Sequence, residues 1–281
     1  MHPVSSIPTL APILEATSEE VARAKAETPE AELRSRCKDE PPTRGFVRSL
    51  TEDRRHPRFG VIAEVKRRSP SAGWMRDEYK PARDRDGFDP AVIAASYQRA
   101  GASAVSCLTE RRFFAGDPGF IGRIRTLVEL PVLRKDFLID PYQVFQARAI
   151  GADAVLLIAE CLPEPELGEM ADLALELGMD VLIEAHAEAQ FERILPLGGP
   201  RTLLGVNNRD LEAMKTDLGH TLRLARRMED PSRLVSESGI RSGEDLRRLA
   251  EAGIGLVLIG EHLMKTEDPG ATLAALLAAA D

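Results

Sequence analysis

Side chains suited to acid–base chemistry follow several short apolar segments of the chain. They are Glu64, Lys66, Lys135, Glu184, Asn207 and Glu237. Ammonium and carboxylate groups that lie close together change each other's proton affinity, which suits general acid and general base catalysis. If the fold brings these side chains to one place, they predict an acid–base site.

The first of these segments carries two of the charges. Glu64 and Lys66 alternate with Ala63 and Val65, so in a β-strand the two charged side chains lie on one face. Charges on a buried strand are costly unless they are paired or functional. A structural ion pair between neighbouring strands is one interpretation. We favour a functional pair, because other predicted strands also end in charged residues.

A repeated pattern indicates which elements position these residues. Residues 101–105 (GASAV) recur as residues 151–155 (GADAV), and residues 253–257 (GIGLV) are a weaker echo. The offsets, 151 − 101 = 50 and 253 − 151 = 102, are near multiples of about 25 residues, the size of one strand plus one helix in a barrel. Each echo places a glycine, which can end a helix, before a buried strand.

Filling the intervals predicts an alternation of strands and helices. Eight strands are expected, at Val61–Lys66, Ser103–Leu108, Val132–Lys135, Ala154–Ala159, Asp180–Glu184, Leu203–Val206, Leu234–Ser236 and Leu256–Ile259. Amphipathic helices are expected between most of them, for example at Pro90–Ala100, Pro141–Ile150, Glu166–Leu177 and Gly243–Ala252. Such alternation predicts parallel strands with right-handed crossovers.

Eight units favour one α/β domain, a closed (β/α)8 TIM barrel over residues 60–281. An open doubly wound sheet is the alternative, but it would need a glycine-rich phosphate turn after its first strand, which the sequence lacks. Residues 1–59 are expected to form an extra N-terminal helical segment packed on the barrel. Within it we predict a helix at Thr17–Ala26, capped by Thr17 or Ser18, and a linker at Asp39–Arg44.

The barrel fold places its active site at the C-terminal ends of the strands, so the charged strand ends are expected to meet at one rim. The last two strands add a second signal. Ser238-Gly239 and Gly260-Glu261 follow them, where backbone N–H groups and helix N-termini usually bind phosphate. The alternative is that both glycines are plain turn residues.

The composition limits the classes of partner. A formal net charge of −8 disfavours a broad surface for nucleic acid or an anionic membrane, and no apolar run reaches the roughly 18 residues that span a bilayer. The cysteines, Cys37, Cys107 and Cys161, form no CxxC pair, and the histidines show no metal-ligand spacing. We expect a cytoplasmic protein, a monomer or weak homo-oligomer, that binds a small molecule and no metal, nucleic acid or membrane.

Six motifs, in order from about residue 60 to the C-terminus, resemble those of the indole-3-glycerol-phosphate synthase family of tryptophan biosynthesis. They are residues 61–73 (VIAEVKRRSPSAG), 108–110 (LTE) with Phe114 and Gly116, 133–140 (LRKDFLID), 205–211 (GVNNRDL), 236–240 (SESGI) and 258–264 (LIGEHLM). The resemblance implies a carboxy-lyase with no cofactor. Its sugar-phosphate substrate would be 1-(2-carboxyphenylamino)-1-deoxyribulose 5-phosphate, which undergoes ring closure, decarboxylation and dehydration.

The resemblance also implies a role for each candidate residue. Lys135 would be the general acid and Glu184 the general base, while Lys66, fixed by Glu64, would hold substrate anions. Asn207 and Glu237 would orient catalytic side chains. Substrate would contact Ser69, Phe114, Phe137, Leu156 and Arg209, and phosphate would contact Ser238, Gly239, Gly260 and Glu261. We further expect burial near a second lysine to lower the pKa of Lys135.

Two departures from the family's pattern and two rival functions remain open. Residues 74–88 form an insertion after the first strand, either a mobile lid or a passive surface loop. Glu261 stands where some relatives carry Ser, and a carboxylate turned toward phosphate would weaken binding. The rival functions are another phosphate-binding barrel enzyme, such as an isomerase or a Schiff-base aldolase, and a non-catalytic barrel paralogue.

Overall fold

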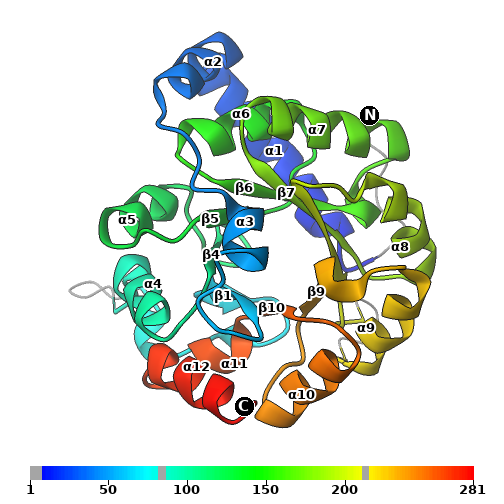
Figure 1. Cartoon of the computed structure of the whole chain (residues 1–281). Coiled ribbons are helices and arrows are strands. Elements are labelled where there is room, and N and C mark those ends of the chain that lie inside the picture. The colour runs from blue at the N-terminus through cyan, green and yellow to red at the C-terminus, as the bar shows by residue number, and fades with distance from the viewer. Residues whose placement is uncertain (1–7, 82–86, 211–214) are drawn as a thin grey trace.

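The computed structural model describes residues 8–81, 87–210 and 215–281. Eight parallel strands close into a barrel in the order β1-β10-β9-β8-β7-β6-β5-β4 (Figure 1). Their bounds are β1 Gly60–Val65, β4 Ala104–Leu108, β5 Val132–Lys135, β6 Ala154–Ile158, β7 Asp180–Ala185, β8 Thr202–Asn207, β9 Leu234–Glu237 and β10 Leu256–Ile259. The predicted TIM barrel is thereby confirmed, and the open sheet is excluded.

Helices surround the barrel (Figure 1). They are α4 Pro90–Arg99, α5 Gly119–Leu127, α6 Pro141–Ala149, α7 Glu164–Glu176, α8 Glu188–Ile194, α9 Gly219–Leu224, α10 Gly243–Glu251, α11 Glu261–Met264 and α12 Pro269–Ala278. Three of them begin in the same way. Asp89, Asp140 and Asp268 each accept a backbone N–H of the first turn, and each is followed by a proline that suits the first helical position. No described helix is long and apolar enough to cross a bilayer.

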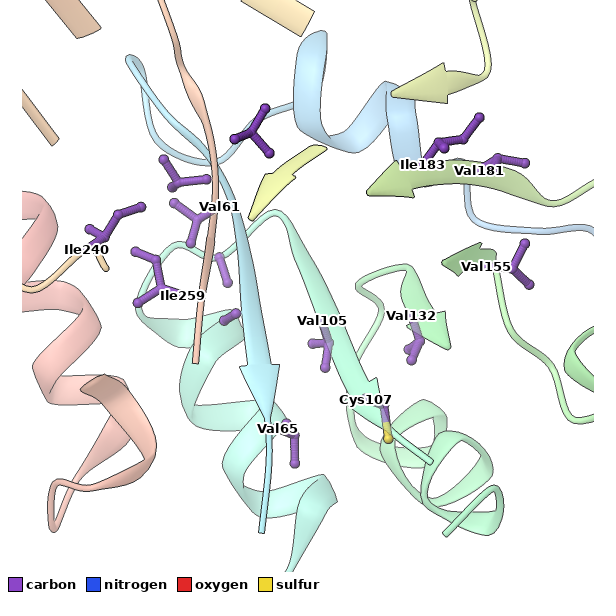
Figure 2. Close-up of a cluster of buried hydrophobic side chains, with 14 of the residues drawn as sticks. Val61, Val65, Val105, Cys107, Val132, Val155, Val181, Ile183, Ile240 and Ile259 are labelled. Atoms are coloured by element: carbon purple, nitrogen blue, oxygen red, sulfur yellow. The ribbon is translucent and has the colours of Figure 1, made fainter. Parts of the chain in front are cut away.

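Strand alternation divides the apolar residues into two layers. One set of side chains points outward and forms the core between strands and helices, including Val61, Val105, Val155 and Ile183 (Figure 2). The other set fills the barrel interior: Ile62, Ala104, Leu133, Ala154, Leu156, Leu182, Leu203, Val235, Leu256 and Leu258. Continuous burial on both faces is the expected pattern of parallel strands enclosed by helices.

The N-terminal segment differs from its prediction. Its described part, residues 8–59, forms three helices, α1 Ala11–Glu27, α2 Glu30–Asp39 and α3 Phe46–Thr51, where one was expected. Thr17 is not an N-cap, because α1 begins six residues earlier with a proline in its first turn, and Thr17 is buried inside the helix. The stretch predicted as a linker separates α2 from α3. In Figure 1, α3 lies over the centre of the ring of strands, and its apolar side chains join those of the barrel interior.

Candidate active site

A cavity of about 490 Å³ opens among the C-terminal ends of the strands. All fifteen residues predicted for the site line it: Glu64, Lys66, Ser69, Phe114, Lys135, Phe137, Leu156, Glu184, Asn207, Arg209, Glu237, Ser238, Gly239, Gly260 and Glu261. The barrel interior below them is apolar, so the charges form one layer above an apolar floor. The structure thus brings together residues separated by up to 197 positions, 261 − 64, in the sequence.

The central contact is an ion pair between the last residue of β5 and a residue of β7. The Nζ of Lys135 lies 2.9 Å from Glu184 Oε2, and the side chains of lysine and glutamate are 13% and 2% exposed. The other oxygen of Glu184 accepts a hydrogen bond of 3.0 Å from the amide of Asn207, which ends β8. Glu184 is therefore held by donors from two neighbouring parts of the rim.

A second ion pair stands on β1. The Nζ of Lys66 lies 2.6 Å from Glu64 Oε1, so the pair forms within one strand end and not between strands. Gly260, at the end of β10, makes room for it, since a Cβ there would lie 2.2 Å from the same oxygen. The glycine of this turn is therefore required by close packing, whatever it does for a ligand.

Glu237 ends β9 without a hydrogen-bond donor on either carboxyl oxygen, within the part of the chain that the structure describes. Its side chain is 1% exposed, and the nearest cation is the Nζ of Lys135 at 3.8 Å. It folds over β8 at Gly205, where a Cβ would lie 2.3 Å from Glu237 Oε1. Burial and the adjacent carboxylate of Glu184 raise the pKa of Glu237 well above its usual range, which favours the neutral acid.

The pKa of Lys135 is raised, so the expected lowering was wrong. Burial alone would lower it, but the charges of Glu184, Glu237 and Glu64 outweigh burial. The mirror effect acts on Glu184: burial alone would raise its pKa, but the charges of Lys135 and His186 and its hydrogen bonds lower it. The resting site therefore holds an ammonium and a carboxylate.

The turn after β9 has an unusual backbone. Ser238 has φ of 66° and Gly239 has φ of 87°, a pair of left-handed residues that costs energy for serine. Asn208 stabilises the turn, because its buried amide donates to the carbonyl oxygens of Glu237 and Ser238 at 3.0 Å each. Sequence reasoning did not assign Asn208, although it follows the assigned Asn207 directly.

Glu261 turns its carboxylate toward cations at the mouth of the cavity. Its oxygens lie 2.8 Å from an Nη of Arg209 and 2.7 Å from the Nζ of Lys265. Burial alone would raise the pKa of Glu261, but these cations outweigh it and lower the pKa. The guanidinium of Arg209 also donates to the hydroxyl of Ser71 at 2.8 Å. The negative charge of Glu261 is thus compensated within the rim.

An apolar wall closes another side of the cavity. The rings of Phe114 and Phe137 are 6.1 Å apart, and Leu156 projects from β6 below them. Glu110 fixes the turn that presents Phe114, since its carboxylate accepts the backbone N–H groups of residues 112, 113 and 114. The wall is continued by Ile13 and Leu10 at the start of α1. This part of the site was missed, because the helix was placed too late in the sequence.

The insertion after β1 is partly described. Met75, Tyr79 and Phe88 are buried in the outer core, and Arg67 donates to the carbonyl oxygen of Tyr79 at 2.6 Å. Residues 74–79 do not line the cavity, which sets this part of the insertion apart from a lid. Residues 82–86, with most of the charged run, lie outside the described residues, as does Leu211 of the 205–211 motif. No group of metal-ligating side chains occurs in the described ranges.

The chain is similar in sequence to named proteins of other bacteria. Chains named indole-3-glycerol phosphate synthase are 47% identical in Magnetococcus marinus and 45% identical in Rhodopirellula baltica. The first alignment covers 94% of this chain and 96% of the relative, and the second covers 95% and 97%.

Solved structures of lower similarity support the fold alone. A 3-hexulose-6-phosphate synthase has a TM-score of 0.60 at 14% identity, over 79% of this chain and 99% of that one. The tryptophan synthase α subunit of Legionella pneumophila has a TM-score of 0.57 at 16% identity, over 85% and 98%. The sequence profile of the family described as indole-3-glycerol phosphate synthase matches residues 10–276. With a profile match over nearly its whole length and relatives above 40% identity, the chain belongs to the indole-3-glycerol phosphate synthase family.

Proposed function

We propose that the cavity converts 1-(2-carboxyphenylamino)-1-deoxyribulose 5-phosphate into indole-3-glycerol phosphate, carbon dioxide and water. The observation that carries the proposal is the buried ion pair between Lys135 and Glu184, 2.9 Å long, inside a cavity that also holds Lys66. An acid and a base in contact suit a reaction that both gives and takes protons at neighbouring atoms.

The substrate has three chemically distinct parts, and the cavity offers a surface for each. Its phosphate binds at Ser238, Gly239, Gly260 and Glu261, chiefly through backbone N–H groups. The aromatic ring packs against Phe114, Phe137 and Leu156. Lys66, held by Glu64, attracts the anionic groups, while Ser69 and Arg209 face the carboxylate-bearing ring and Asn207 and Glu237 orient the catalytic side chains.

Lys135 acts as the acid of ring closure. Its raised pKa keeps it protonated in the resting site, so a proton is always ready. As the aromatic carbon attacks the ribulose carbonyl carbon, the carbonyl oxygen becomes an alkoxide, which is more basic than an amine and takes the proton. Decarboxylation then restores an electron-rich ring.

Glu184 acts as the base of dehydration, and its strength depends on Lys135. While Lys135 is charged, the pKa of Glu184 is lowered and the carboxylate is a weak base. When Lys135 gives its proton to the substrate, that influence ends and Glu184 becomes a stronger base. The order of events follows: the base gains strength only after the acid has acted.

The proton balance supports the need for several ionisable groups. The former carbonyl oxygen receives two protons and leaves as water, and the methylene carbon beside nitrogen loses one. Because the carboxylate leaves as neutral carbon dioxide, each turnover takes up one proton. Glu237, as a neutral acid near Lys135, is placed to help return a proton to the amine.

An aldolase that uses a lysine as nucleophile is the second candidate, and the charge state disfavours it. Schiff-base formation needs a neutral amine, whereas the pKa of Lys135 is raised by three carboxylates. Borohydride reduction in the presence of substrate separates the two functions. The synthase leaves the protein mass unchanged, and a Schiff base adds the mass of the reduced adduct.

The direct test adds the carboxyphenylamino-deoxyribulose phosphate to the purified protein. Indole-3-glycerol phosphate, followed by its indole fluorescence, and carbon dioxide are expected to form in equal amounts. Substrate that binds but yields no indole would refute the proposal and favour a non-catalytic barrel.

The wider expectations belong to the same proposal. We take residues 60–281 as the catalytic barrel and residues 1–59 as an extension that contributes Leu10 and Ile13 to the cavity wall. We place the enzyme in the cytoplasm as a monomer or weak homo-oligomer, acting on a sugar phosphate and not on nucleic acid. Size-exclusion chromatography with light scattering checks the oligomeric state.

A further inference from the structure

A buried histidine connects Glu184 to a second carboxylate. His186 follows β7, and its side chain is 9% exposed. Its Nε2 lies 3.2 Å from Glu184 Oε1, and its Nδ1 lies 3.3 Å from Glu160 Oε2. Glu160 lies in the short 3₁₀ helix η2, Ala159–Cys161, after β6. The three side chains form a continuous row from the proposed base into the protein.

Glu160 is not a residue that touches substrate. Its side chain is 3% exposed, and it is absent from the described lining of the cavity, which His186 reaches. Besides the ring of His186, its oxygens accept the backbone N–H groups of His186 at 2.7 Å and Ala187 at 3.1 Å. Burial alone would raise the pKa of Glu160, but the hydrogen bonds and charge of His186 lower it. A carboxylate whose contacts converge on one histidine fixes that histidine's position.

Both ring nitrogens of His186 face carboxylate oxygens. The contact of Nδ1 with Glu160 has the geometry of a hydrogen bond, and Nε2 makes a close contact of 3.2 Å with Glu184 Oε1. Other charged or polar groups around it are already engaged. Lys135 pairs with Glu184, and Arg193 donates to the carbonyl oxygens of Ala159 and Leu162. The ring of His220 contacts the carbonyl oxygen of His186, and the exposed Glu188 pairs with Arg227.

We propose that His186, held in place by Glu160, is a positioning residue that aims Glu184 at the proton it removes. The inference rests on the proposed function, because it takes Glu184 as the base. The amide of Asn207 donates to Oε1, and the ring of His186 lies against the same oxygen, which leaves Oε2 to Lys135 and then to the substrate. Once Lys135 has given up its proton, Oε2 is free while Oε1 stays fixed.

The test uses substrate with deuterium on the methylene carbon beside nitrogen, the carbon that Glu184 deprotonates. In His186→Asn we expect kcat to fall about 10- to 100-fold, because a misplaced base slows proton removal. KM is expected to stay within about twofold of wild type, since the lost contact serves the transition state. The deuterium isotope effect on kcat is expected to rise, because this step then limits turnover. A merely structural loss would reduce active protein and leave the isotope effect unchanged.

Glu160→Gln removes a charge with little change of shape. The new amide oxygen still accepts the backbone N–H groups of His186 and Ala187, but the negatively charged oxygen that faces Nδ1 is lost. We expect a smaller fall in kcat than in His186→Asn and again a larger isotope effect. Glu188→Gln is the matched control, since Glu188 lies nearby but is 55% exposed and binds Arg227. It is expected to behave as wild type.

The outcomes separate this inference from the function beneath it. Folded His186→Asn and Glu160→Gln proteins with wild-type kcat and isotope effect would overturn the inference. If His186→Asn does not fold, Glu160→Gln decides. Glu184→Gln is measured in parallel: wild-type turnover there refutes the proposed base itself, whereas loss of turnover there, with none in the other two, refutes only the role of His186.

Discussion

Both ends of the barrel contain buried charges, but only one end satisfies all of them. At the N-terminal end, Asp153 accepts the backbone N–H groups of Arg44 and Val132 at 2.8 Å each and pairs with Arg125 at 2.7 Å. Asp180 accepts hydrogen bonds from the backbone N–H of Val47 and from the Nε–H of Arg201, each 2.8 Å long. These carboxylates join the N-terminal segment and the helices to the strand ends.

At the opposite end, the charges compete. Lys135 faces the carboxyl groups of Glu184 and Glu237, and among the described residues Glu237 finds no donor for either oxygen. A fully satisfied buried charge contributes to stability, whereas an incompletely satisfied one persists at a cost and is typical of functional sites. The two ends therefore show that partners, and not burial alone, distinguish a structural charge from a chemical one.

The largest expected effect is at the centre of the rim. Lys135→Met removes the ammonium while keeping the length of the side chain. We expect kcat to fall about 10³-fold, the usual scale for a lost general acid, with the fold retained. Single-turnover indole fluorescence measures the rate, and circular dichroism checks the fold. Turnover within tenfold of wild type would remove Lys135 from its role.

The next effect is expected from the base. Glu184→Gln keeps the hydrogen bond from Asn207 but cannot take a proton. We expect kcat to fall about 10²-fold with little change in KM, because the carboxylate acts in the transition state. Steady-state kinetics provides both constants. A rise in KM at constant kcat would make Glu184 a binding residue instead.

A substitution at the N-terminal end of the barrel should lower the stability of the protein and leave the rate of the reaction unchanged. Asp153→Ala leaves Arg125 and two backbone N–H groups without their acceptor, so we expect the free energy of unfolding to fall by about 3 kcal/mol. Urea unfolding measures the loss. Asp53→Ala is the control, because it breaks an ion pair with Arg48 in which both side chains are 65% exposed. It should lower the free energy of unfolding by less than about 1 kcal/mol. Equal losses would contradict the assignment.

The last effect concerns Glu237 and appears as a change of stability with pH. Its folded-state pKa is raised, so the folded protein binds this proton more tightly than the unfolded chain. The resulting stability is present below the unfolded pKa and is lost as pH rises toward the folded pKa. Glu237→Gln cannot titrate, so its stability relative to wild type should increase between pH 4 and pH 8, by about 1.4 kcal/mol per unit of pKa difference. A difference that stays constant with pH would show that Glu237 is ionised.

Much of the barrel was predictable because its signals are local. β5 at Val132–Lys135 and β10 at Leu256–Ile259 match their predicted bounds. β10 is a short apolar run soon after the helix-ending Gly253, and β5 is a short strand that begins directly after Pro131. The meeting of Lys66, Lys135 and Glu184 followed from the rule that strand ends share one rim. The family resemblance then supplied the substrate.

What failed depends on contacts that no local pattern records. α3 has only six residues, and its helix is stabilised by packing against the barrel interior. The pKa of Lys135 was misjudged because the sequence places glutamates at the rim but does not give their distances to Lys135, which are 2.9 Å for Glu184 and 3.8 Å for Glu237. No sequence pattern marked Glu160, because its role depends on its distance to His186 in the folded protein.

The most direct test of the account compares Lys135→Met with Asp153→Ala in one assay of indole formation, at equal concentrations of folded protein. The account predicts that Asp153→Ala turns over at a rate within about twofold of wild type, while Lys135→Met falls below about one hundredth of it. Comparable turnover by the two variants would contradict the claim that the charges of the rim perform the chemistry and those of the opposite end maintain the fold.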